Sequence, residues 1–115
     1  MNHRSRALLN LAHRVTSCMN CGCHTEGCEP AHENGVTAGK GFGIKGHDHR
    51  HAALCHDCHA WYDQGGKRSP CGLWAADKVQ KREMWTRAHL KTMDYYWGQG
   101  WVCVAGRAPH PMETA

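Results

Sequence analysis

Two short stretches of the chain, Cys18-Met-Asn-Cys21 and Cys55-His-Asp-Cys58, carry the same Cys-x-x-Cys spacing. Each pair can offer two thiolates to one tetrahedral Zn²⁺, and this is the commonest structural use of the spacing. The sequence therefore predicts one closed structural zinc site with four ligands, Cys18, Cys21, Cys55 and Cys58. Cys23 and Cys28 lie close enough along the chain to replace Cys18, so the spacing leaves that ligand open.

The composition indicates that the fold needs such a staple. The chain has 115 residues, of which only one is Phe and eight are Cys. A single domain of this size with few large apolar residues has a thin core and usually depends on metal or disulfide cross-links. Cys71 and Cys103 lie outside the predicted zinc set, and we expect them to be buried thiols.

The N-terminal sequence bears on whether the staple is metal or disulfide. The apolar run over residues 7–12 is too short for a signal peptide, and no stretch approaches the roughly 20 apolar residues of a membrane span. We therefore expect a cytoplasmic protein with no membrane partner. In that reducing compartment paired cysteines favour zinc, with a disulfide framework and unliganded thiols as the alternatives.

The charge balance suits an acidic partner. Lys and Arg number 14 against 10 Asp and Glu, which gives a formal net charge of +4 at pH 7. A basic domain attracts nucleic acid through the phosphates of its backbone. A solvated basic surface explains the same balance equally well.

The residue pattern divides the chain into four segments. They are a basic N-terminal helix or arm over residues 1–17, a zinc-binding core over 18–66, a helical extension over 67–103 and a disordered tail over 104–115. The run from His51 to Asp63 contains no Gly or Pro, and this predicts a helix that begins near the second cysteine pair and ends at residues 64–66. The extension predicts a longer helix from about Leu73 to Tyr96.

His59 and Asp63 are the first residues outside the cysteines that point to chemistry. They are four residues apart in the first predicted helix, so their side chains lie on the same face. A histidine nitrogen and a carboxylate can together bind Mg²⁺, Mn²⁺ or Zn²⁺ and leave other positions for water and a phosphate oxygen. A simple His–Asp hydrogen bond on the helix surface is one alternative, and His59 as a zinc ligand in place of a cysteine is another.

Several of these features together resemble a known signature. In chain order they are Cys21, Ala31-His32, the glycine-rich lysine loop that ends at Gly43-Ile-Lys45, Asp48, and Cys55-x-x-Cys58-His59-x-x-x-Asp63. This set resembles the HNH, or ββα-metal, nucleases, and is similar to a family of short phage and prophage proteins regarded as HNH-type nucleases. The resemblance covers about residues 18–65. It implies a small α+β domain, a zinc-stapled treble-clef or ββα-metal fold with flanking helices, in a bacterial host cell.

The resemblance also implies roles for individual residues. His32 matches the general base, and a neutral imidazole can take a proton from water near pH 7. His59 and Asp63 match the ligands of the catalytic divalent ion. Lys40 and Lys45 lie in the glycine-rich loop, where exposed N–H groups and ammonium groups could hold the DNA backbone, although a plain turn between two strands is equally consistent with this loop.

Two positions depart from the family pattern. Many HNH proteins place an acidic residue directly before the base, where this chain has Ala31, so an ion ligand is missing unless Asp48 or a histidine at 47, 49 or 51 supplies it. The middle Asn of the motif is absent too, and Asp48 stands nearest its place. Asp48 can therefore either orient His32 through a hydrogen bond or bind the ion, and the sequence does not choose between them.

Together these features predict a metal-dependent endonuclease that hydrolyses DNA phosphodiester bonds. It would use a structural Zn²⁺, a catalytic Mg²⁺, Mn²⁺ or Zn²⁺, and no small-molecule cofactor. A water deprotonated by His32 would attack phosphorus in line, and charge on the leaving 3′ oxygen would be neutralised at the ion site of His59 and Asp63. The alternative is a non-catalytic zinc-finger module that binds nucleic acid or a protein, and Ala31 favours it.

Overall fold

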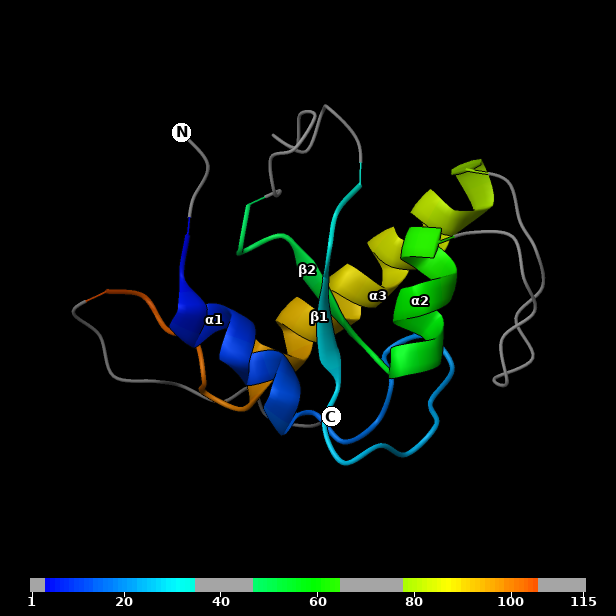
Figure 1. Cartoon of the computed structure of the whole chain (residues 1–115). Coiled ribbons are helices and arrows are strands. Elements are labelled where there is room, and N and C mark those ends of the chain that lie inside the picture. Colours follow the sequence, from blue (N-terminus) through cyan, green and yellow to red (C-terminus); the bar gives the residue numbers. More distant parts are fainter. Residues whose placement is uncertain (1–3, 35–46, 65–77, 106–115) are drawn as a thin grey trace.

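A computed structural model describes residues 4–34, 47–64 and 78–105 of the chain. These residues form a small α+β fold, in which a two-stranded antiparallel sheet is surrounded by three α-helices (Figure 1). In chain order the elements are α1 (Arg6–Asn10), a 3₁₀ turn η1 (Leu11–Arg14), β1 (Glu29–His32), β2 (His51–Leu54), α2 (His56–Gln64) and α3 (Lys78–Gly98). None of the described helices is long and apolar enough to cross a membrane.

The two strands pair over their whole length, with Glu29 opposite Leu54 at one end and His32 opposite His51 at the other. Pro30 lacks an N–H, and β1 tolerates it because only one of its edges is paired in this sheet. All four residues of β2 are buried. Strand β2 is therefore covered on both faces, whereas β1 is only partly buried.

The core lies in two clusters, one on each face of the hairpin. Side chains alternate along a strand, so Ala52 and Leu54 point to one face and Ala53 to the other. The first cluster contains the aromatic residues Trp61 and Trp85, from α2 and α3. The second packs residues of the N-terminal segment and the end of α3 against Ala53. Helix α3 thus contributes to both clusters, and the N-terminal segment contributes to the second.

Helix α3 crosses the hairpin and hydrogen-bonds its backbone (Figure 1). The Thr92 Oγ1 accepts from the Ala53 N–H at 3.0 Å, and His89 Nδ1 donates to the His51 carbonyl at 2.7 Å. The indole N–H of Trp85 donates to the Ala31 carbonyl at 2.8 Å. Because buried backbone groups are costly to leave unpaired, these side chains replace the neighbouring strands that a larger sheet would provide.

Two of the observed helices correspond to the predicted ones. The helix expected after the second cysteine pair is α2, and the long helix expected to end near Tyr96 is α3, which continues to Gly98. The N-terminal segment forms two short helical turns, with Ser5 as the N-cap whose Oγ accepts from the Leu8 N–H. The start of the long helix at Leu73 lies outside the described residues.

The prediction for Cys103 is wrong, because the residue is exposed. Its prediction as a buried thiol followed residue type alone, but Cys103 comes after α3 has ended and belongs to no helix or strand. Cys71 and the tail from residue 106 onward lie outside the described residues.

Candidate metal centre and histidine–carboxylate site

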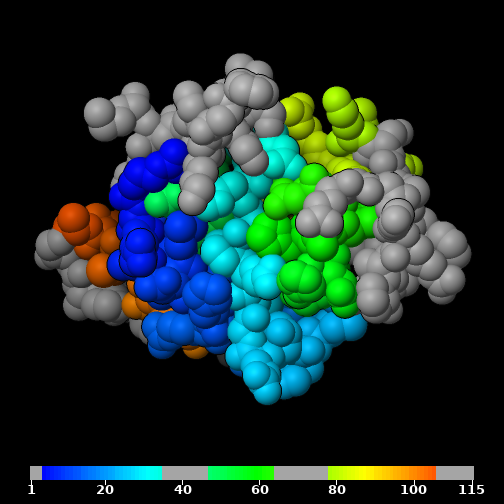
Figure 2. All heavy atoms as spheres, viewed as in Figure 1, coloured from blue at the N-terminus to red at the C-terminus, as the bar shows by residue number. Residues whose placement is uncertain are grey.

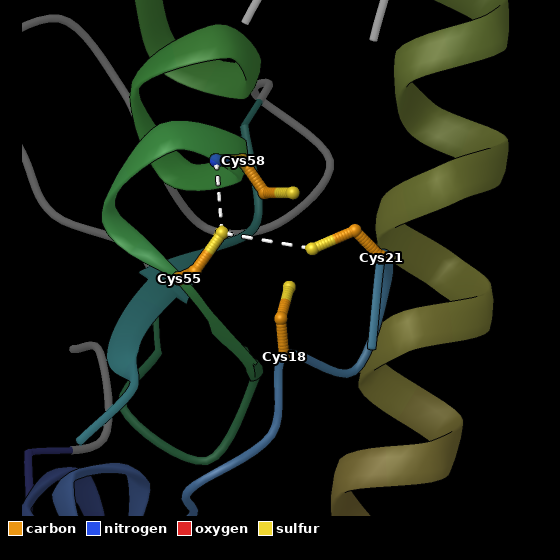
Figure 3. A group of neighbouring side chains, drawn as sticks. All are labelled: Cys18, Cys21, Cys55 and Cys58. Carbon is orange, nitrogen blue, oxygen red and sulfur yellow. Dashed lines mark hydrogen bonds between the residues drawn. The ribbon is translucent and has the colours of Figure 1, made fainter. Parts of the chain in front are cut away.

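The four predicted zinc ligands meet at one point. Cys18 and Cys21 come from the loop before β1, Cys55 from the junction of β2 and α2, and Cys58 from the first turn of α2 (Figure 3). Their sulfur atoms all lie within 4.8 Å of one another, and the Cys21 and Cys55 sulfurs are 3.8 Å apart. Zn–S bonds of about 2.3 Å in a tetrahedron require sulfurs about 3.8 Å apart. The cluster therefore has the donor set and the geometry of a structural Zn²⁺ site.

Each sulfur also accepts a hydrogen bond from an N–H group. Three donors are backbone N–H groups, those of Asn20, Cys23 and Cys58, and the fourth is the side-chain amide of Asn20. The loop reaches this geometry through Gly22, whose φ of 76° is costly for other residues. These N–H groups stabilise thiolate charge, which a metal site of four cysteines concentrates at one point.

The same contacts shift the pKa values of two of the thiols in opposite directions. A hydrogen bond from the Cys58 thiol, with help from nearby backbone N–H groups, lowers the pKa of Cys18 below its ordinary value. That same bond and burial raise the pKa of Cys58. The Cys18 sulfur is thus disposed to be a thiolate, which is the form that binds zinc.

The structure resolves which cysteine accompanies Cys21. Cys28 is fully buried, its thiol lies 3.5 Å from the Ser17 carbonyl, and burial raises its pKa to about 12. Cys23 is exposed and contributes its backbone N–H to the cluster but not its sulfur. Cys18 is therefore the fourth member. No disulfide joins any of the cysteines within the part of the chain that the structure describes.

His59 lies beside this cluster but belongs to a different one. Its Nε2 is 3.0 Å from Asp63 Oδ2, and its Nδ1 is 2.8 Å from Glu29 Oε1. A carboxylate can only accept, so this arrangement has both ring nitrogens as donors, and it favours the protonated imidazole. The contact with Asp63, followed by that with Glu29, raises the pKa of His59 despite its partial burial.

The spacing of His59 and Asp63 suits two ligands of one ion. Two donor atoms at about 2.1 Å from a metal and at right angles to each other are about 3.0 Å apart. The two ring and carboxylate atoms are separated by this distance. A helix-surface hydrogen bond gives the same contact, so the distance alone does not separate these two readings. His59 is not a member of the cysteine cluster.

His32 is paired with Asp48. His32 Nε2 donates to Asp48 Oδ1 at 3.0 Å, and Asp48 is only 4% exposed. The other Asp48 oxygen accepts from the Ser5 N–H at 2.6 Å, and Arg4 lies 3.3 Å from the first. Burial alone would raise the pKa of Asp48, but these donors, His32 and Ser5 foremost, lower it on balance. Nδ1 of His32 has no hydrogen-bond partner among the described residues.

Asn34 links the end of β1 to the last turn of α2. It follows the end of β1 by two residues, and its backbone N–H donates to the Tyr62 hydroxyl at 2.9 Å. Its side-chain amide donates to Asp63 at 3.4 Å. Asp63 therefore lies close to the end of β1 that carries His32. On the face shown in Figure 2, β1 reaches the surface between the N-terminal segment and α2.

Ala31 and His51 do not provide the missing ion ligand. Ala31 is fully buried beneath Trp85. His51 is fully buried too, with Nδ1 bonded to the Asp48 carbonyl and Nε2 to the Tyr96 hydroxyl. Burial lowers the pKa of His51 to about 4. It is a neutral core residue.

Glu29 is the residue that sequence reasoning missed. The family pattern places an acidic side chain directly before His32, whereas Glu29 lies three residues before it and reaches α2 only because of how the helix packs on β1. Lys40 and Lys45, the predicted DNA-backbone contacts, lie outside the described residues.

Comparison of the chain with protein-family models, with curated proteins and with solved structures gives no significant match. Its function has to be inferred from the residues themselves.

Proposed function

We propose that this chain is a zinc-stapled, metal-dependent endonuclease of ββα-metal type that hydrolyses phosphodiester bonds in DNA. The observation that carries the proposal is the placement of two histidine–carboxylate sets within one ββα unit, one at the end of β1 and one on α2. His32 ends β1 with Asp48 behind it, and α2, which follows β2, carries His59 and Asp63. The order of two strands and a helix, with one histidine on the first strand and one on the helix, agrees with the ββα-metal signature.

His32 would act as the general base. Asp48 accepts from Nε2, which fixes the tautomer and leaves Nδ1 as the atom that takes a proton. A water that gives its proton to Nδ1 forms a new bond to phosphorus, while the bond from phosphorus to the 3′ oxygen breaks and that oxygen takes a proton from solvent. Both Asp48 oxygens are engaged by protein donors, which favours orientation of the base over ion binding.

His59 and Asp63 would hold the divalent ion through Nε2 and a carboxylate oxygen. A bound Mg²⁺ or Mn²⁺ would neutralise charge on the phosphate and on the leaving oxygen. To bind the ion, His59 must release the proton on Nε2 and keep the proton on Nδ1. The Nδ1–H group then donates a hydrogen bond to Glu29. The chain thus offers a neutral imidazole and a carboxylate from one helical face.

DNA is the proposed substrate because of the net charge of +4 and the resemblance of the motif. Lysine and arginine side chains would contact the phosphate backbone without reading bases. A phage or prophage origin and a bacterial cytoplasm follow from the resemblance alone.

Nicking of supercoiled plasmid by the zinc-loaded protein, in Mg²⁺ or Mn²⁺, tests the proposal. His32→Ala should slow cleavage by about 10²- to 10⁴-fold, because it removes the base. His13→Ala is the matched control, since His13 is exposed and lies in η1 away from both sets. Both variants should bind DNA and melt as the wild type does.

The second candidate is a zinc-finger module without catalysis. The burial of Ala31 and the engagement of both His59 nitrogens favour it, because neither offers a ready ion ligand. DNA binding by the wild type without metal-dependent cleavage, on single-stranded, double-stranded and branched DNA, would establish this alternative. Equal cleavage by wild type and His32→Ala would remove His32 as the base.

A further inference from the structure

Glu29 bridges β1 and α2. One carboxylate oxygen accepts from His59 Nδ1 at 2.8 Å, and the other accepts from His56 Nδ1 at 3.1 Å. His56 is mostly exposed, with 79% of its side chain accessible, whereas His59 is 25% exposed. The hydrogen bond with His59 is the shorter of the two and is better shielded from water, so it is the stronger interaction of Glu29.

The direction of α2 decides which nitrogen of His59 faces the site. The first turns of α2 contact Glu29 at the start of β1, and its last turn contacts Asn34 beyond the end of β1. The helix and the strand therefore run in the same direction. Nδ1 of His59 points toward the start of the strand, and Nε2 points toward Asp63, at the His32 end.

We propose that Glu29 is a positioning residue that holds the Nδ1 proton of His59 and so presents Nε2, with Asp63, to the divalent ion. The inference rests on the proposed function. Ala31 stands where the family pattern has an acidic residue, and Glu29 provides an acidic residue elsewhere on β1. Glu29 acts through His59 and does not bind the ion itself. Histidine ligands commonly donate their second N–H to a carboxylate in this way.

The strand register explains why a residue three positions before His32 can serve. Glu29 and Ala31 alternate to the same face of β1, the face on which Ala52 and Leu54 pack with residues of α2. Ala31, in the middle of the strand, is covered by the core. Glu29, at the start of the strand, lies at the edge of that core and can keep a charged group partly in water while reaching the helix.

Titration of the zinc-loaded protein with Mn²⁺, followed by calorimetry and by the electron paramagnetic resonance of free Mn²⁺, tests the proposal without an activity measurement. Glu29→Ala should weaken Mn²⁺ binding by about 10- to 100-fold, as loss of such a carboxylate does in other metal sites. Glu29→Gln should weaken Mn²⁺ binding roughly threefold, because the amide oxygen can still accept a hydrogen bond from the Nδ1–H group. Asp63→Ala, which removes a ligand, should abolish it.

Two controls separate positioning from a loss of structure. Glu26→Gln removes the same charge from an exposed position near the cysteine loop and should leave the Mn²⁺ affinity unchanged. Zinc content and circular dichroism should be the same in all variants. Nitrogen-15 NMR of the His59 ring with saturating Mg²⁺ should show the Nδ1–H form in the wild type and in Glu29→Gln, and a tautomer mixture in Glu29→Ala.

The outcomes distinguish this inference from the proposed function. If the wild type binds Mn²⁺ and both Glu29→Ala and Glu29→Gln bind it with the same affinity, the role of Glu29 is overturned. The nuclease proposal would still stand. A persistent Nδ1–H form in Glu29→Ala would likewise overturn the role of Glu29 alone. No Mn²⁺ binding by the wild type, or binding that survives Asp63→Ala, would overturn the ion site and both proposals together.

Discussion

The two ends of the β1–β2 hairpin are stabilised by different chemistry. At the Leu54 end, Cys55 and its three partners bring four sulfurs within 4.8 Å, and each sulfur receives one N–H donor. At the His51 end there is no such cluster among the described residues, and the Asp48 carboxylate accepts from two separate segments, the N-terminal segment and β1. One end has the four sulfur ligands of a candidate metal site, and the other has hydrogen bonds among titratable groups.

This difference implies that the two ends respond to different perturbations. Removing metal acts on the cysteine end, because thiolates repel one another without a cation. Lowering the pH acts on both, but at the His51 end it protonates a histidine that the fold keeps neutral. Under the proposed function, the cysteine cluster serves as scaffold and the histidine–carboxylate sets carry the chemistry.

The largest effect should follow from breaking the cysteine cluster. Cys55→Ser, or removal of zinc by a strong chelator, should abolish cooperative folding, since a structural zinc contributes on the order of 10 kcal/mol in small zinc domains. Thermal melting followed by circular dichroism measures the loss of cooperative folding, and zinc analysis measures the loss of the ion. Cys23→Ser is the matched control, because its exposed sulfur is outside the cluster and it should retain zinc and melt normally. A zinc-free Cys55→Ser protein that still melts cooperatively would show that the hydrogen-bonded end suffices.

The same contrast explains what the sequence could predict. The cysteine set, α2 and the contact of His59 with Asp63 all follow from spacings of a few residues, so local pattern predicts them. The environment of Asp48 does not, because its partner Ser5 is 43 residues away and only folding brings them together. Glu29 was missed for the same reason: its role depends on how α2 packs on β1, which no short pattern records.

A pH series sharpens the comparison at the His51 end. His51 has its pKa lowered to about 4 by burial, against 6.5 as its ordinary value, so the unfolded chain binds this proton first as the pH falls. Its contribution to stability is present above pH 6.5 and is lost between 6.5 and about 4. At about 1.4 kcal/mol per pH unit, the free energy of unfolding should fall by about 3 kcal/mol from this group alone.

His51→Gln isolates that contribution. Because loss of zinc would abolish cooperative folding, the comparison is made only at pH values where both proteins retain zinc. Within that range the difference between their free energies of unfolding, measured in urea from pH 7.5 downward, should shrink steadily as the pH falls. Parallel curves for the two proteins would mean that His51 is not kept neutral by the fold.

The smallest predicted effect concerns the middle of the hairpin, where neither metal nor titration acts. Thr92 accepts from the Ala53 N–H and donates to the Ala88 carbonyl, so Thr92→Val, which is nearly isosteric, leaves a buried N–H unpaired. It should lower the free energy of unfolding by about 1–3 kcal/mol without changing zinc content. Thr86→Val is the matched control: Thr86 also donates to the carbonyl four residues before it but is exposed, so its effect should stay within about 0.5 kcal/mol. Equal effects of the two variants in urea unfolding would show that α3 does not stabilise the strand through this bond. The hairpin would then depend on its two ends alone.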